Sequence, residues 1–124
     1  MNTLLIEETK GTPRVCLNSD GEMHIEGRSL PEDPVLFYAP VLDWVRRCTV
    51  ENVIIHVRLD YMNTSSSKEI YLFFKCIRAN EHIKKAVVNW YYEEGDDDVY
   101  ETGREFENIS GLPFYYHTYA EALE

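Results

Sequence analysis

The stretch Val53-Ile54-Ile55-His56-Val57-Arg58-Leu59 is the part of the sequence that decides the fold most directly. It is rich in β-branched residues and almost continuously apolar, which is typical of a strand buried on both faces of a sheet. Further along the chain, apolar residues recur at the i, i+3, i+4, i+7 spacing of one helix face: Ile70, Phe73, Phe74 and Ile77. A central strand followed by an amphipathic helix predicts an α/β domain in which this helix packs on the sheet.

The residues before this strand predict a small antiparallel region. Short strands are expected over Leu4–Glu7, Arg14–Asn18 and Met23–Glu26. The segment Asn18-Ser19-Asp20-Gly21 predicts a hairpin turn, because Asp-Gly tolerates the positive backbone angles that tight turns need. Polar residues alternate with apolar ones around the third strand, which predicts a wet face of the kind found at a sheet edge; they are Glu22, His24 and Glu26.

A first helix is expected between these strands and the central one. Asp33 is a suitable cap, and Pro34 fits the first turn, where a missing N–H has no cost. The helix should run toward Cys48 with an apolar stripe made of Val41, Leu42, Trp44 and Val45. Pro40 lies within this span and is expected to kink the helix or to delay its start.

The second half of the chain continues the alternation. Ala86–Tyr92 predicts a strand, and the acidic segment Glu93–Asp98 leads into a third helix that ends at Gly111-Leu112-Pro113. Phe114–His117 predicts a last strand. Residues 1–124 are therefore expected to form one α/β sandwich domain with a mixed sheet and about three helices.

The charge balance excludes several classes of partner. Twenty-two acidic residues against 12 basic ones give a formal net charge of −10. Such a chain is repelled by a phosphate backbone and by an anionic membrane surface, so we expect neither nucleic acid nor a membrane as partner. The opening residues MNTLLIEETK lack the basic region and long apolar core of a secretion signal, which favours a cytoplasmic protein.

The cysteines and histidines offer no sequence signature of a metal site or an active site. Cys16, Cys48 and Cys76 are odd in number and widely spaced, as expected of small core residues in a reducing compartment. The four histidines are also far apart in the sequence, without the paired spacing that gives a metal preformed ligands. No phosphate-binding glycine loop or nucleophile-and-base motif is visible. The sequence thus predicts no metal, no cofactor and no catalytic residue.

A run of polar residues, Asn63–Ser67, stands between the central strand and the second helix. In alternating α/β sheets, ligands and regulatory groups collect at such strand-to-helix turns. One interpretation is helix capping, with Ser66 and Glu69 forming an S-x-x-E capping box and with Asn63 and Thr64 satisfying further N–H groups. The other is a phosphoacceptor, because a helix start tolerates the charge of about −1.5 to −2 that a phosphate brings. The pattern alone leaves both open.

The segment Tyr61-Met62-Asn63-Thr64-Ser65-Ser66-Ser67-Lys68 resembles the Y-L-N-T-S-S-x-K signature of the SiaC family of regulatory phosphoproteins. Met62 and Ser67 are departures from that pattern, as is Pro40. Other segments resemble the family in the same order and extend the resemblance over nearly the whole chain: Gly11-Thr12-Pro13, Leu30-Pro31-Glu32, Leu42-Asp43-Trp44-Val45 and Pro113-Phe114.

The resemblance implies a fold like that of STAS-type anti-anti-sigma proteins and a phosphorylation site at Thr64. It also implies three partners: a dedicated Ser/Thr protein kinase, an opposing PP2C-like phosphatase, and a GGDEF-type diguanylate cyclase that the unmodified protein binds and activates. The residues expected to contact partners surround Thr64; they are Tyr61, Met62, Asn63, Ser65, Ser66 and Lys68.

Two alternatives stay open around this site. Lys68, one helical turn from Thr64, either pairs with the phosphate or remains a solvated charge. The whole protein is alternatively an anti-anti-sigma factor that binds a sigma-inhibiting kinase. The sequence does not separate the two functions, since both use the same hydroxyl at the same helix start.

Overall fold

The computed structural model describes residues 2–120. Its strands form a six-stranded sheet in sequential order, β1 to β6, accompanied by three helices. The first three strands pair antiparallel and the last four pair parallel, which confirms the predicted mixed α/β architecture. The elements are β1 (Leu4–Ile6), β2 (Arg14–Leu17), β3 (Glu22–Ser29), α1 (Pro34–Arg47), β4 (Asn52–Met62), α2 (Thr64–Ala79), β5 (Lys85–Glu93), α3 (Asp97–Ser110) and β6 (Phe114–Tyr119). Within the described part of the chain, no helix has the length and apolar character needed to cross a membrane.

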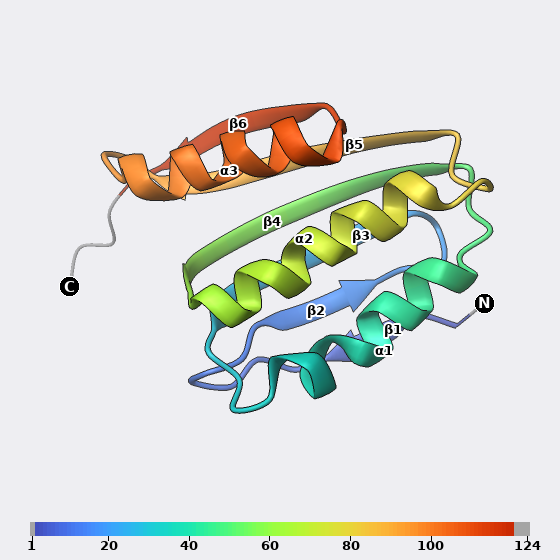
Figure 1. Cartoon of the computed structure of the whole chain (residues 1–124), viewed down its shortest axis with the longest axis horizontal. Helices are drawn as coiled ribbons and strands as arrows, with labels where there is room; N and C mark the ends of the chain where they lie inside the picture. The colour runs from blue at the N-terminus through green and yellow to red at the C-terminus, as the bar shows by residue number, and fades with distance from the viewer. Residues whose placement is uncertain (1, 121–124) are drawn as a thin grey trace.

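All three helices lie on one face of the sheet (Figure 1). Each helix connects two neighbouring parallel strands, and the strand order always advances in the same direction. Because such crossovers are right-handed almost without exception, successive crossovers in one direction place their helices on the same side. We call the opposite side the open face; its central residues are Glu22, His24, Glu26, Ile54, His56, Arg58, Asn89, Tyr91, Tyr115 and His117.

The one-sided arrangement corrects the prediction for the central strand. β4 does lie inside the sheet, between β3 and β5. It is not buried on both faces, however: Ile55 and Val57 are fully buried, whereas Ile54 on the open face is 40% exposed. An apolar run has the same composition whether helices cover one face of the sheet or both. The sequence alone therefore predicted that Ile54 would be buried, whereas it is exposed on the open face.

The sheet-edge interpretation of the third strand is also wrong. β3 pairs with β2 on one side and with β4 on the other, so it is an interior strand. Its polar residues Glu22, His24 and Glu26 are half-buried because they point to the open face. An uncovered face and an exposed edge produce the same alternation of polar and apolar residues.

α1 begins where its cap predicts. Asp33 Oδ1 accepts the Leu36 N–H at 3.0 Å, and Pro34 is the first helical residue. Pro40 lies inside the helix, so the expectation that it would delay the start is wrong. Pro40 cannot bond to the carbonyl of Leu36, but both residues are on the exposed side, where water can replace that bond.

The core fills the space between the helices and the covered face. The predicted apolar stripe of α2 is buried there, and its Phe74 ring contacts Phe106 of α3 and Phe114 of β6 at centroid distances of 5.6 and 5.2 Å. Trp90 of β5 is fully buried, and its indole N–H donates to the Val99 carbonyl at 3.0 Å. This packing fixes α2 on the sheet and thereby sets the position of its first residues.

Candidate functional site

The start of α2 lies directly beyond the carboxyl end of β4. Met62 is the last strand residue, Asn63 is the helix cap, and Thr64 is the first helical residue. The Asn63 side-chain oxygen accepts the backbone N–H of Ser66 at 2.8 Å. This confirms the part of the capping interpretation that used Asn63. The capping box of Ser66 and Glu69 is wrong, because Ser66 lies inside the helix and its hydroxyl bonds to Ser29.

The hydroxyl residues of this segment differ sharply in accessibility. Thr64 and Ser65 are exposed, Ser67 is half-buried, and Ser66 has 0% exposure. Asn63, not Thr64, caps the helix, and the exposed Thr64 hydroxyl is therefore available at the surface of the helix start. The structure thus separates the capping residue from the residues that an enzyme can reach.

Ser66 has a structural role that the sequence did not indicate. Its hydroxyl donates to the Ser29 carbonyl at 3.0 Å and accepts from the Ser29 hydroxyl at 2.9 Å. The Tyr38 hydroxyl lies 2.6 Å from Ser29 Oγ and, since that oxygen's only proton goes to Ser66, donates to it. Burial raises the pKa of Tyr38 to about 12, which keeps this donor protonated.

Ser66 is consequently not a surface residue, which corrects its assignment as a partner-contact residue. Its hydrogen bonds tie α2 to β3, and those of Tyr38 extend the link to α1. The remaining predicted contact residues are accessible to different degrees: Tyr61 is 47% exposed, Ser65 and Lys68 are exposed, and Met62 and Asn63 are half-buried. Their contact with a partner stays a prediction.

An acidic hollow of about 280 Å³ lies at the carboxyl end of β4, the strand that precedes α2. Its lining combines the end of β4 with the cap and first turns of α3: Leu59, Asp60, Tyr61, Met62, Asp96, Asp98, Val99 and Thr102. Asp60 accepts hydrogen bonds from the Arg58 guanidinium at 3.0 Å and from the Tyr119 hydroxyl at 2.9 Å. Since Asp60 is paired with Arg58, Asp96 and Asp98 carry most of the negative charge of the hollow.

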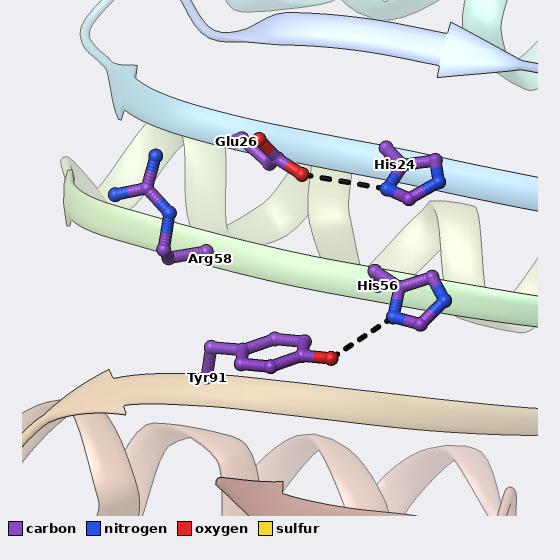
Figure 2. A pocket seen from close by; sticks show the side chains of 5 residues that line it. All are labelled: His24, Glu26, His56, Arg58 and Tyr91. Carbon is purple, nitrogen blue, oxygen red and sulfur yellow. Dashed lines mark hydrogen bonds and ion pairs between the residues drawn. The ribbon is translucent and has the colours of Figure 1, made fainter. Parts of the chain in front are cut away.

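A second group of polar residues, which the sequence analysis missed, lies on the open face. A shallow pocket of about 320 Å³ is lined by His24, Glu26, His56, Arg58 and Tyr91, which come from three neighbouring strands (Figure 2). His24 and His56 are far apart in the sequence, but they are register partners in β3 and β4. Only the pairing of the strands could have revealed this, because the sequence does not state which strands are neighbours.

The structure therefore defines a class of protein: a small α/β domain with a one-sided sheet, an accessible threonine at a helix start, and an acidic hollow at the end of the strand that precedes this helix. Comparison with known sequences gives the family. Residues 6–119 match the sequence profile of the SiaC family of regulatory phosphoproteins. The chain belongs to the SiaC family.

Known relatives from one organism agree with this placement. An uncharacterized protein of Pseudomonas aeruginosa strain UCBPP-PA14 is 28% identical over 119 residues, which cover 92% of this chain and 94% of the relative. The crystal structure of apo-SiaC from Pseudomonas aeruginosa superposes with a TM-score of 0.84 at 27% identity, covering 94% of this chain and 99% of that one. The fold predicted from the sequence is thereby confirmed.

A further solved structure includes a partner. It is that of the diguanylate cyclase SiaD in complex with its activator SiaC from Pseudomonas aeruginosa, and this chain matches it with a TM-score of 0.81 at 25% identity, over 94% of this chain and 99% of that one. In that pair of proteins, the SiaC fold binds and activates an enzyme.

Proposed function

We propose that this protein is a phosphorylation-controlled partner-switching protein. In its unmodified form it binds and activates a GGDEF-type diguanylate cyclase, and a Ser/Thr protein kinase blocks this binding by phosphorylating Thr64. A PP2C-like phosphatase removes the phosphate and restores the active form. The protein itself performs no catalysis, and the switch operates in the cytoplasm, where the kinase has ATP.

The observation that carries the proposal is the exposed hydroxyl of Thr64 at the first position of α2 in a member of a family of regulatory phosphoproteins. Burial of Ser66 removes one competing hydroxyl of the segment, because a kinase cannot reach it without partial unfolding. The similarity to a SiaC that activates the cyclase SiaD supports the choice of partner.

A phosphate at Thr64 is compatible with the fold. Negative charge near the first N–H groups of a helix is favoured by about 0.3 to 1 kcal/mol. The same charge adds to a chain whose net charge is already −10, and it must lose water to enter an interface. A loss of about 2.7 kcal/mol of binding free energy weakens an affinity a hundredfold, so a phosphate that costs this much is sufficient to release the cyclase.

The first experiment is intact-protein and peptide mass spectrometry on the chain purified from its native host with phosphatases inhibited. The proposal expects one phosphate on Thr64. Binding of the diguanylate cyclase is then measured for Thr64→Ala, Thr64→Asp and, as the matched control, Thr49→Asp, which places the same charge at an exposed threonine that precedes β4 whereas Thr64 follows it. Thr64→Ala and Thr49→Asp should bind like the wild type, and Thr64→Asp about a hundredfold more weakly.

Two results would count against this function. Equal cyclase affinity of Thr64→Ala and Thr64→Asp, together with absence of phosphate at Thr64, would remove the switch. Capture of a sigma-inhibiting kinase instead of the cyclase, with the same dependence on Thr64, would keep the switch and replace the partner.

A further inference from the structure

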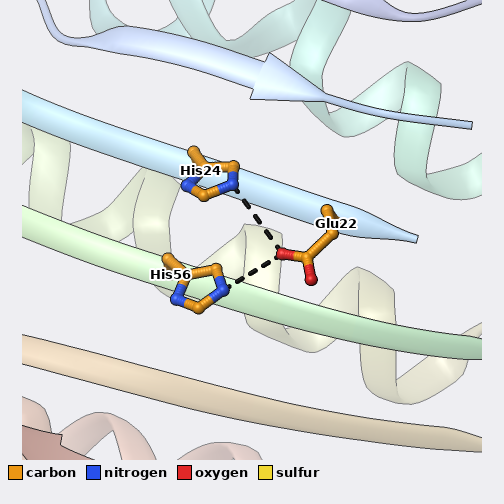
Figure 3. Close-up of side chains that lie close together, drawn as sticks. All are labelled: Glu22, His24 and His56. Carbon is orange, nitrogen blue, oxygen red and sulfur yellow. Dashed lines mark hydrogen bonds and ion pairs between the residues drawn. The ribbon is translucent and has the colours of Figure 1, made fainter. Parts of the chain in front are cut away.

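We propose that Glu22, His24 and His56 on the open face bind a divalent transition-metal ion, of which Zn²⁺ is the expected occupant. The three side chains converge on one point above β3 and β4, as Figure 3 shows. Glu22 and His24 are alternate residues of one strand, and His56 is the register partner of His24 in the next strand. The rigid ladder between the two interior strands therefore holds all three side chains in place.

The distances between the ligand atoms suit a tetrahedral ion. Glu22 Oε2 lies 3.1 Å from His56 Nε2 and 3.8 Å from His24 Nε2, and one ligand atom from each residue lies within 4.8 Å of the others. Ligands at about 2.0–2.1 Å from Zn²⁺ in tetrahedral geometry are separated by about 3.3–3.4 Å. The separation between Glu22 and His56 is already close to this value, and rotation about the side-chain torsions of His24 has to shorten the others. Two imidazoles with one carboxylate are a known zinc ligand set.

The outer partners of both histidines already orient the rings for metal binding. Glu26 Oε1 lies 3.4 Å from His24 Nδ1, and the Tyr91 hydroxyl lies 3.2 Å from His56 Nδ1. Histidines that bind metals usually donate the N–H of the other ring nitrogen to a carboxylate, a carbonyl or water, which fixes the tautomer and makes the ligating nitrogen more basic. Here Glu26 and Tyr91 lie next to the two Nδ1 atoms, and both Nε2 atoms face Glu22.

The environment also leaves room for a fourth ligand. The side chains of Glu22, His24 and His56 retain 41%, 31% and 22% of their exposure. They stand on the open face next to the shallow pocket, so water can complete the coordination. The two histidine rings are stacked, with centroids 4.7 Å apart and planes inclined by 14°. Because a metal ion has to lie in the plane of each imidazole that binds it, the two rings must tilt toward each other when the ion binds.

The test is a titration of the metal-free full-length chain with Zn²⁺ in competition with a fluorescent chelator. We expect one ion per chain, with affinity reduced by tenfold or more in each of His24→Ala, His56→Ala and Glu22→Gln. His117→Ala on the same face and His82→Ala after α2 are matched histidine controls that should bind like the wild type. Cys16→Ser is needed as well, because Cys16 is the register partner of His24 in β2 and is itself a possible zinc ligand.

Three outcomes would overturn the site: wild-type affinity no higher than that of a His24→Ala/His56→Ala double variant, loss of binding in a histidine control, or loss of binding in Cys16→Ser. Circular dichroism of each variant verifies that the fold is intact.

A further variant, Glu26→Gln, tests whether Glu26 positions His24. It should lower the affinity for the metal by about tenfold and alter the visible spectrum of bound Co²⁺. An unchanged affinity and spectrum would show that Glu26 does not orient His24. This site is independent of the proposed switch, so neither result depends on phosphorylation.

Discussion

The two faces of the sheet are made from the same strands but have opposite properties. On the covered face, β4 presents Ile55 and Val57, both without exposure, to the helices. On the open face, the same strand presents His56 and Arg58 to a shallow pocket. The apolar core is therefore concentrated on one side of the sheet, and half-buried polar side chains are gathered on the other.

This difference follows from topology rather than from the composition of the individual strands. Sequential right-handed crossovers place every helix on one side, so a strand buried among neighbours still has one accessible face. Because side chains alternate along a strand, two residues adjacent in sequence serve opposite faces. Substitutions at adjacent positions thus provide matched comparisons between the faces.

The largest contrast is expected between Trp90 and Tyr91 of β5. Trp90 is fully buried and packs at 5.7 Å from the Phe106 ring, so Trp90→Ala should lower the free energy of unfolding by about 3–5 kcal/mol. Tyr91 is half-buried on the open face, so Tyr91→Ala should cost about 1 kcal/mol or less. Urea denaturation of both variants measures the contrast. Equal losses would mean that the open face contributes to stability as the core does.

The covered face is also the part that the sequence predicted well. The spacing of Phe73, Phe74 and Ile77 identified the buried stripe of α2, and Asp33 and Gly111 marked the ends of helices that the structure confirms. These features depend on local periodicity and capping, which a sequence contains directly. The number and order of the elements followed from them.

The open face could not be predicted in the same way. Whether a polar residue of β3 stands at an edge or on an uncovered face depends on which strands pair, and His24 meets His56 only through that pairing. The hydroxyl run of α2 posed a related problem. The sequence located the helix start and offered both Asn63 and a Ser66–Glu69 box for capping. It could not exclude Ser66, because the burial of Ser66 against Ser29 depends on a contact between distant segments.

A tyrosine buried on the covered side should make stability depend on pH above about 10 more strongly than a tyrosine on the open face. The folded state raises the pKa of Tyr38 to about 12, mainly through burial. Below pH of about 10, Tyr38 is protonated in both states and contributes no pH dependence; above it, the unfolded chain loses the proton first, so stability falls as pH rises. Two pKa units correspond to at most about 2.7 kcal/mol.

The matched variants for this effect are Tyr38→Phe and Tyr119→Phe. Tyr38→Phe should be less stable at pH 8, since it loses the hydrogen bond to Ser29, but should lose less additional stability between pH 9 and 11. Burial and the bond to Asp60 also raise the pKa of Tyr119 to about 12, yet surrounding solvent screens this side chain, so Tyr119→Phe should change the slope less. Denaturation of both variants across this pH range measures the effect. If Tyr119→Phe alters the pH dependence of stability more than Tyr38→Phe does, Tyr38 is not the main source of that dependence.

A smaller loss of stability is expected where α3 packs closely on the covered face of the sheet, at Gly103. A Cβ atom at Gly103 would lie 2.6 Å from Trp90 Nε1, so Gly103→Ala forces α3 away from β5. We expect a loss of about 1–3 kcal/mol in spite of the higher helix propensity of alanine. Glu105→Ala, at an exposed position of the same helix, is the control and should be neutral. A stabilised Gly103→Ala would show that the helix shifts at no cost.

The smallest change in stability is expected at the start of α2, next to Thr64. Asn63→Ala removes the side-chain oxygen that accepts the Ser66 N–H, so it should lower stability by about 1 kcal/mol. Ser65→Ala changes an exposed hydroxyl and should leave stability within about 0.5 kcal/mol of the wild type. If Ser65→Ala is the more damaging substitution, the capping assignment fails. If Asn63→Ala is the more damaging one, Asn63 holds the helix start, and a charge at Thr64, the phosphorylation site that we propose, does not remove the cap on which the helix depends.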